Sequence, residues 1–172
     1  MTKKYGEIMD KQTQDVLELL EQNAKLTPED ISEMTRIPQK DVKKMIQSLE
    51  DAGIIRYYKA IIDWDLVENP YVYAFVQIKV SLERGHGYQK LADRICKFPE
   101  VRSLRLLSGE DYDLEFMVRG RSMKDVAFFV SDKIATMAQV QNTSTHFILK
   151  TYKEDGIIME EPEEFKRLHV SF

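Results

Sequence analysis

Apolar positions in the N-terminal third of the chain repeat every three to four residues, which is the spacing of amphipathic helices. One such run covers residues 11–23. A second, shorter helix should begin at Pro28, because Thr27 before it is a good N-cap and proline suits the first helical position. The residues expected to be buried on these two helices are Val16, Leu17, Leu20, Ile31 and Met34.

A third helix, from about Pro38 to Ala52 with Gly53 as its C-terminal cap, has two stripes of different character. The apolar stripe consists of Val42, Met45, Ile46 and Leu49. The second stripe is displaced by two residues, or about 200° around the helix, and consists of Lys40, Lys43, Lys44 and Gln47. The helix should therefore bury one side and present ammonium and amide groups on the other.

Two short β-like runs, at residues 54–56 and 60–63, follow this helix and predict a hairpin. A helix, a short helix, a turn, a longer basic helix and a hairpin follow one another in the winged helix-turn-helix. We expect a DNA-binding domain of this kind over residues 1–63 and a polar linker over residues 64–71. A three-helix module that binds protein has the same apolar pattern and is the alternative.

From residue 72 the pattern changes to alternation. One face of the predicted strand carries Val72, Ala74, Val76, Ile78, Val80 and Leu82, and the other carries Tyr71, Tyr73, Phe75, Gln77 and Lys79. Later segments predict a helix at 88–98, strands at 101–108 and 114–118, a helix at 122–136 with Val126, Val130 and Ile134 inward, and a strand at 140–152. This βαββαβ order predicts an α+β protein whose second domain, residues 72–152, is ferredoxin-like.

Two helices on one face of such a sheet leave the other face open, with Tyr73 and Phe75 on it. Exposed apolar patches of this kind mark partner surfaces, and a twofold contact uses one patch twice. We therefore expect a homodimer formed sheet to sheet. The alternative is that a C-terminal segment covers the sheet, but residues 153–172 form an acidic extension (Glu160, Glu161, Glu163 and Glu164), which suits an apolar face poorly.

The charge distribution adds a candidate polyanion surface. The 172 residues carry 25 basic and 29 acidic groups, but residues 36–59 hold six basic against three acidic ones. Positive charge gathered on one face lets a weakly acidic protein bind nucleic acid, although such a cluster, taken alone, is usually only a solvated helix face. The DNA-binding candidates are Arg36, Gln39, Lys40, Lys43, Lys44, Gln47, Arg56 and Lys59.

Residues typical of catalysis or metal binding are few. The three histidines, His86, His146 and His169, are far apart without ligand spacing, and Cys96 is most simply a small core residue. There is no glycine-rich phosphate loop, no serine-elbow motif, no secretory signal and no apolar run of the ~20 residues that span a bilayer. We expect a cytoplasmic protein that is not an enzyme and uses no metal or cofactor. The rival is an oligomeric ligand-binding protein or small enzyme whose N-terminal module contacts protein.

Several short motifs stand in a fixed order over about residues 8–152. In the first half they are Asp30-Ile31, Val42, Ile46, Leu49-Glu50, Gly53-Ile54-Ile55 and Tyr58-Lys59-Ala60-Ile61-Ile62-Asp63. In the second half they are Phe98-Pro99-Glu100-Val101 and Ser108-Gly109-Glu110-Asp111-Tyr112-Asp113-Leu114. In this order and spacing the chain resembles the Lrp/AsnC family, the leucine-responsive and asparagine-operon regulators of bacteria and archaea.

The resemblance implies a sequence-specific transcriptional regulator of amino-acid metabolism that pairs through its C-terminal sheets and assembles into tetramers or octamers. It also implies a small amino acid as effector, bound between dimers by the turn and the segment entering the last strand. The effector-binding candidates are Ser108, Gly109, Asp111, Tyr112, Asp113, Met137 and Thr143. A zwitterion needs donors for its carboxylate and an acid for its ammonium, which Asp111 or Asp113 could supply. From the residues alone, an ordinary hairpin turn is the alternative.

Overall fold

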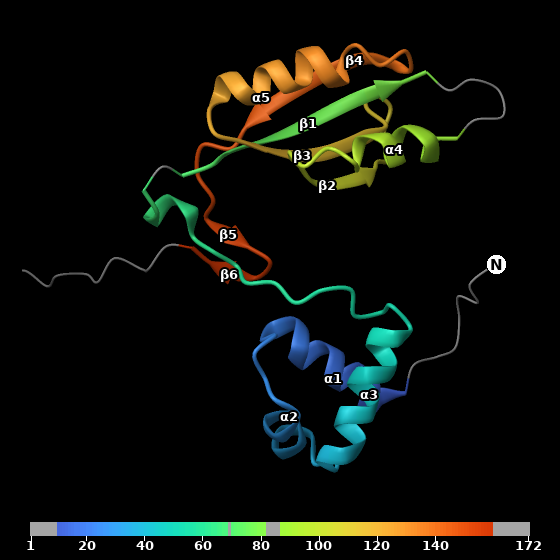
Figure 1. Cartoon of the computed structure of the whole chain (residues 1–172), viewed down its shortest axis with the longest axis vertical. Coiled ribbons are helices and arrows are strands. Elements are labelled where there is room, and N and C mark those ends of the chain that lie inside the picture. The colour runs from blue at the N-terminus through green and yellow to red at the C-terminus, as the bar shows by residue number, and fades with distance from the viewer. Residues whose placement is uncertain (1–9, 69, 82–86, 160–172) are drawn as a thin grey trace, which may run out of the picture. The chain divides into compact units, whose positions relative to one another are not determined.

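The computed structural model describes residues 10–68, 70–81 and 87–159 (Figure 1). The chain divides into two compact units, one up to Ile61 and one from Ile62, and each is described by itself. Among the described residues, no helix combines the length and the apolar character needed to cross a bilayer. Leu82, His86, His169 and the acidic stretch from Glu160 lie outside the described residues.

The first unit contains the three predicted helices, α1 (Lys11–Gln22), α2 (Pro28–Thr35) and α3 (Gln39–Asp51). Thr27 starts α2 through a capping box, in which its hydroxyl accepts from the Asp30 N–H at 3.2 Å while the Asp30 carboxylate accepts from the Thr27 N–H at 2.7 Å. Gly53, at φ +67°, follows the end of α3 in the left-handed conformation that glycine adopts most easily. The predicted start of α2 and the predicted end of α3 are therefore both confirmed.

The core of this unit joins all three helices through Val16, Leu20, Ile31, Ile37 and Val42. The prediction that Met34 is buried was wrong, because its side chain is 60% exposed. Arg36 adopts the left-handed conformation, with φ 61°, and this bend turns Ile37 into the position against the core. Ile37, which follows the bend, is buried in this core, whereas Met34, in the last turn of α2, is not.

The predicted hairpin after α3 is not formed: the residues between Gly53 and Asp63 contain no strand. The N–H groups of Ile54 and Ile55 both donate to the Leu49 carbonyl, at 2.9 and 3.2 Å, and so close the end of the helix. The residues that follow are mostly exposed, with Tyr57 at 85%, so no apolar surface of the described chain holds a second strand in place. The segment leaves the helix as extended chain.

The second unit has the predicted βαββαβ order. Its elements are β1 (Val72–Val80), α4 (Gln89–Ile95), β2 (Val101–Leu106), β3 (Leu114–Gly120), α5 (Met123–Phe129) and β4 (Val140–Phe147). The strands form one antiparallel sheet in the order β2-β3-β1-β4, which confirms the ferredoxin-like fold. A short π-helical segment, Val130–Ile134, continues α5 within the helix predicted over 122–136, and only its π type was not predicted.

One face of the sheet and both helices enclose the core of this unit. The buried residues alternate along β1 and β3 and recur with helical spacing on α4 and α5. The sequence predicted those on β1 and on the helices (Ala74, Val76, Ile78, Val80, Leu91, Ile95, Val126, Val130 and Ile134), whereas Leu114, Phe116, Val118 and Phe129 were not predicted. Cys96, expected in this core, is exposed. It lies one residue past the end of α4, where Leu91 and Ile95 already occupy the buried side.

The last strand is shorter than predicted. It ends at Phe147, and not at Tyr152. The reason is that its partner β1 begins at Val72, and the last hydrogen bond between the two segments is the one from the Ile148 N–H to the Tyr73 carbonyl, at 2.9 Å. The chain then forms a small separate hairpin of β5 (Lys153–Glu154) and β6 (Ile157–Ile158). Asp155 and Gly156 make its turn, at φ 45° and 86°.

Candidate functional site

Lys40, Lys43, Lys44 and Gln47 are all exposed along one side of α3, and we call this set the α3 basic face. Val42 and Leu49 on the opposite side are buried, as the two stripes in the sequence predicted. None of the three lysines makes a hydrogen bond or ion pair with any residue in the described parts of the chain. The face therefore presents ammonium groups that the fold itself leaves unneutralised.

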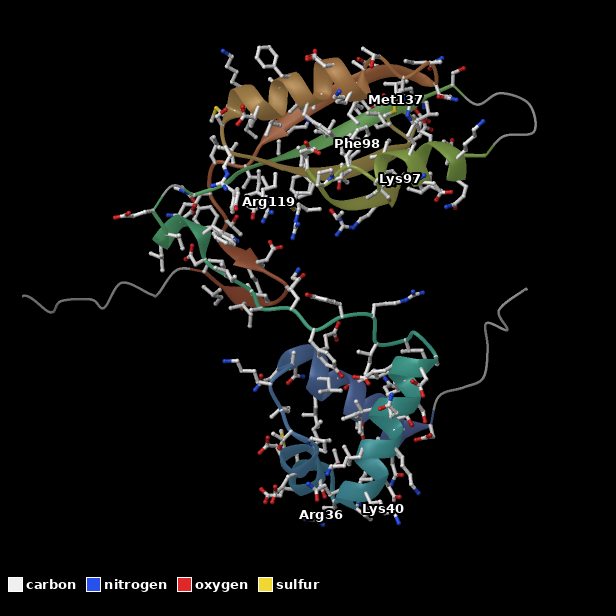
Figure 2. The ribbon with its side chains drawn as sticks, in the orientation of Figure 1. Arg36, Lys40, Lys97, Phe98, Arg119 and Met137 are labelled. Atoms are coloured by element: carbon white, nitrogen blue, oxygen red, sulfur yellow. The ribbon has the colours of Figure 1, made fainter. Side chains whose placement is uncertain are left out.

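The turn between α2 and α3 sets where this face begins. Arg36 ends α2 in the left-handed conformation, and the Ser32 hydroxyl donates to the Ile37 carbonyl at 2.6 Å across the turn. Pro38 precedes α3 and gives it no side-chain cap. Figure 2 shows Arg36 and Lys40 at the same end of the unit, where α3 starts.

Three acids, Asp41, Glu50 and Asp51, lie on α3, and sequence reasoning did not weigh the positions of the first and the last. Asp41 lies in the first turn, where it suits the positive end of the helix dipole. Asp51 lies one turn beyond Gln47 on the α3 basic face, and its carboxylate accepts from the Gln47 side-chain amide at 3.0 Å. The C-terminal end of the face is thus acidic, and Gln47 is oriented by that acid.

The remaining DNA-binding candidates lie at the two ends of α3. Gln39 opens the helix and is exposed, as is Lys59 in the extended segment that follows it. Arg56 is also exposed, and its guanidinium lies over Gly53, where an added Cβ would meet its Cζ at 3.7 Å. The guanidinium of Arg56 is therefore kept close to the end of α3.

In the second unit, the turn between β2 and β3 is fastened to β1 and α4 through Asp113. The carboxylate of Asp113 accepts from the Val80 N–H at 2.8 Å and from the Tyr88 hydroxyl at 3.1 Å. Its backbone N–H donates to the Ile78 carbonyl at 2.9 Å. Tyr88 and Val80 are 25 and 33 residues from Asp113 in sequence, so spacing alone could not have found this junction.

Lys79 adds a second attachment for the same turn. Its ammonium donates to the Glu110 carbonyl at 2.6 Å and lies 3.6 Å from the Asp113 carboxylate. Burial alone would raise the pKa of Asp113, but the hydrogen bonds from Val80 and Tyr88 and the charge of Lys79 outweigh it, so the pKa of this carboxyl lies below its ordinary value. Burial and the bond to Asp113 in turn raise the pKa of Tyr88.

The other effector candidates fall into two groups. Ser108, Gly109 and Asp111 are exposed on the turn, and Tyr112 is half-buried there. Thr143 lies at the same end of the sheet, because Ile78 pairs with Thr143 on one side and with Leu114, next to the turn, on the other. Met137 is 2% exposed and packs inside the core (Figure 2), so within one chain its side chain is not open to solvent.

Comparison with known families decides what this pair of units is. Residues 73–158 match the family profile described as Lrp/AsnC ligand binding domain, and residues 9–56 match the one described as winged helix-turn-helix DNA-binding. The chain belongs to the Lrp/AsnC family. It is a transcriptional regulator with a helix-turn-helix DNA-binding domain and an Lrp/AsnC ligand-binding domain, and not an enzyme.

Relatives of similar length support this assignment along the whole chain. An uncharacterised HTH-type transcriptional regulator of Bacillus subtilis (strain 168), YugG, is 44% identical over 165 residues, which are 95% of this chain and 98% of that one. A transcriptional regulator from Neisseria meningitidis, solved in complex with L-Met, is 28% identical with a TM-score of 0.68 over 85% of this chain and 93% of that one. The AsnC structure from E. coli, 18% identical with a TM-score of 0.66 over 86% and 97% of the two chains, has the same fold.

Proposed function

We propose that this Lrp/AsnC-family protein binds specific sequences in double-stranded DNA through the α3 basic face. The observation that supports this most directly is that three lysines without ion-pair partners among the described residues share one exposed side of the helix that follows the turn. A protein surface that neutralises DNA phosphates has to hold its cations free of internal partners, and an α-helix fits the major groove.

In this arrangement, Lys40, Lys43, Lys44 and Gln47, with Gln39 beside them, face the major groove. Lysine and glutamine side chains can reach both phosphates and base edges there. Arg36, Arg56 and Lys59 lie outside the helix itself and bind the phosphate backbone on either side. The local excess of positive charge is small, six basic against three acidic groups over residues 36–59, so high affinity requires two or more DNA-binding domains that act together.

The open face of the sheet is our proposed dimer surface. Phe75 lies at its centre, paired with Met117 on β3 and with His146 on β4. Polar pairs flank this apolar middle, for example the Gln77 side-chain amide donating to the Glu115 carboxylate at 3.0 Å. A self-complementary patch with an apolar centre and a polar rim suits a twofold contact. Dimers would then assemble into tetramers or octamers in the cytoplasm.

We further propose that a small amino acid, bound at the β2–β3 turn between dimers, changes the spacing of the DNA-binding domains and so regulates genes of amino-acid metabolism. The L-Met complex of the Neisseria meningitidis relative supports an effector of this class. Asp113 already accepts two hydrogen bonds, so the exposed Asp111 is the better partner for the effector ammonium. Ser108 and Gly109 would supply donors to its carboxylate, with Tyr112, Thr143 and Met137 around the side chain.

Capture of genomic fragments by the purified full-length protein tests the DNA proposal. Wild-type protein should enrich a small set of fragments, and the Lys43→Ala/Lys44→Ala variant should enrich none of them. Equal enrichment of all fragments by both proteins would contradict sequence-specific binding through α3.

The effector proposal is tested by calorimetry of the full-length protein against each proteinogenic amino acid. At least one should bind to the wild type and lose most of its affinity for Asp111→Asn. If none binds, the effector proposal is wrong, while the DNA proposal is unaffected.

A further inference from the structure

Residues 64–71, predicted as a polar linker, carry two aromatic side chains that pack at the end of the sheet. The ring of Trp64 meets the ring of Tyr71 edge-on, at 5.1 Å between centres. The guanidinium carbons of Arg119 and Arg121 lie 4.2 and 4.8 Å from the centre of the same Tyr71 ring. We call these four residues the Tyr71 cluster, and Figure 2 shows Arg119 at this end of the sheet.

The Tyr71 cluster joins two parts of the second unit that are distant in the sequence. Arg119 lies in the β1–β3 ladder, and Arg121 follows the end of β3. Trp64 opens a 3₁₀ turn, Trp64–Leu66, that precedes the sheet. Trp64 and Tyr71 are both half-buried. Cation–π contacts and edge-to-face aromatic pairs are attractive at these distances, so the cluster holds the turn before β1 against the end of β3.

Local hydrogen bonds close the 3₁₀ turn. The Asp63 carboxylate accepts from the Asp65 N–H at 3.0 Å, and the Val67 N–H donates to the Trp64 carbonyl at 3.2 Å. The second compact unit begins at Ile62, directly before this turn. The turn is therefore part of the second unit, and the Tyr71 cluster attaches it there.

The chain before the boundary between the two units is attached to α3. The Tyr58 hydroxyl donates to the Glu50 carboxylate at 2.9 Å, and both residues lie in the first unit. Residues 60–62 are exposed and make no hydrogen bond with any residue in the described parts of the chain. The stretch from residue 59 to residue 62, which joins the two attachments, spans at most about 14 Å. The connection between Tyr58 and Asp63 is thus only four residues long.

We propose that the Tyr71 cluster is an anchor that makes the 3₁₀ turn move with the second unit, so that the DNA-binding domain changes its orientation only through residues 59–62. Without the anchor, the connection would lengthen to residues 59–71. A short connection keeps the DNA-binding domains of a dimer at a high effective concentration for neighbouring sites, because that concentration falls as a linker lengthens. The consequence for DNA rests on the proposed function, whereas the anchor itself does not.

Trp64 is the one tryptophan of the chain, so its fluorescence reports on the anchor directly. In the full-length wild type, the time-resolved anisotropy of Trp64 should decay at the slow rate of a folded domain. Tyr71→Ala removes the ring that Trp64 and both arginines contact, and it should add a fast component and shift the emission to the red. Tyr71→Phe keeps the ring and should keep the wild-type decay.

Tyr152→Ala is the matched control. It removes another tyrosine ring of the second unit, which is 63% exposed and lies 5.1 Å from the Lys150 ammonium, and it should leave the Trp64 signals unchanged. Arg121→Gln replaces Tyr71→Ala if that variant does not fold, because Arg121 is exposed and lies beyond the end of β3. It should add a smaller fast component, since the Tyr71 ring then loses one of its two cations.

Two DNA probes separate the anchor from DNA binding itself. One is a duplex with two binding sites, taken from the fragments that the wild type enriches, and the other is the same duplex cut to one site. Tyr71→Ala should lower the affinity for the two-site duplex about three- to tenfold, because the connection lengthens, and leave the affinity for the one-site duplex unchanged. Tyr152→Ala should change neither affinity.

The anchor is overturned if wild type and Tyr71→Ala give the same Trp64 decay, or if Tyr152→Ala changes that decay as much as Tyr71→Ala does. A fast component in Tyr71→Ala with unchanged affinity for the two-site duplex would overturn the role of the anchor in DNA binding. If the wild type binds no duplex, the proposed function fails, while the Trp64 decay still decides whether the anchor exists.

Discussion

The α3 basic face and the β2–β3 turn are both polar surfaces, but they differ in whether their charged side chains have partners within the fold. The lysines of the α3 basic face have no partners among the described residues. In the turn, Asp113 is bonded to Val80 and Tyr88, and Lys79 to Glu110. A surface for a polyanion is ready when its cations are free, whereas a loop that recognises a small ligand must first be held in one shape.

The largest effect is expected from the double substitution Lys43→Ala/Lys44→Ala, which removes the free charges of the first region. DNA affinity should fall at least about tenfold at low salt, and the slope of log K against log salt should flatten by about 1.8 for each domain that binds. A fluorescence anisotropy titration across salt concentrations measures both quantities.

The control is Lys90→Ala/Lys97→Ala, which removes two exposed lysines of the second unit. It should leave the DNA affinity and its salt dependence unchanged. An unchanged salt slope in the α3 variant would separate the α3 basic face from DNA binding.

Asp113→Asn tests the β2–β3 turn, because an amide accepts the hydrogen bonds from Val80 and Tyr88 less strongly than a carboxylate and forms no ion pair with Lys79. The free energy of unfolding of the second unit should fall by about 1–3 kcal/mol. Asp111→Asn, on the exposed side of the same turn, should change it by less than about 0.5 kcal/mol. Urea unfolding followed by circular dichroism provides the comparison, and equal effects of the two variants would mean that the turn is not fastened through Asp113.

The stability lost in Asp113→Asn should also depend on pH. The pKa of Asp113 is lowered in the folded state, so its contribution is complete above the unfolded pKa of about 3.9 and is lost as pH falls through the lower, folded value. The difference in unfolding free energy between wild type and Asp113→Asn should therefore shrink between pH 5 and pH 2. Asp10 and Asp30, whose pKa values are also lowered, are present in both proteins and cancel.

Asp51→Asn should strengthen DNA binding by the α3 basic face, because it removes the acid at the C-terminal end of that face. We expect DNA affinity to rise about two- to fivefold, because an exposed charge of this kind is worth up to about 1 kcal/mol. Asp93→Asn on α4 is a matched control, since Asp93 accepts from the Gln89 side chain with the same four-residue spacing. A rise for both variants would reflect net charge alone.

The smallest effect on stability is expected from Gly109→Ala. An added Cβ would meet only the Tyr112 carbonyl, at 3.7 Å, so unfolding should be unchanged within about 0.5 kcal/mol. At Gly120 the same substitution would bring Cβ to 2.8 Å from Val126 and should cost about 1–3 kcal/mol. Loss of amino-acid binding in Gly109→Ala without loss of stability would assign that glycine to the ligand.

Local signals in the sequence were sufficient for most of the secondary structure. The Thr27 cap, the break at Gly53 and the alternation along Val72–Val80 each depend on residues within a few positions of one another. The β5–β6 hairpin also had a local signal that was missed, because Asp155-Gly156 between short strands is a favoured hairpin turn.

The features that could not be predicted from the sequence depend on contacts between residues that are distant in the sequence. The length of β4 is set by where β1 begins, and the segment after α3 has strand-forming residues but no neighbouring strand among the described residues. Of the site residues, those on α3 followed from helical periodicity alone. The attachment of Asp113 to Tyr88 and Val80 joins residues 25 and 33 positions apart, which no spacing in a single sequence reveals.

The backbone of Arg36 has a consequence for how this regulator can change. A residue with a side chain held at φ 61° costs roughly 1–3 kcal/mol relative to glycine at the same corner. Glycine there would make the first unit firmer and at the same time delete a cation from the surface proposed to meet DNA. Glycine at position 36 would therefore raise the stability of the first unit and lower its proposed affinity for DNA.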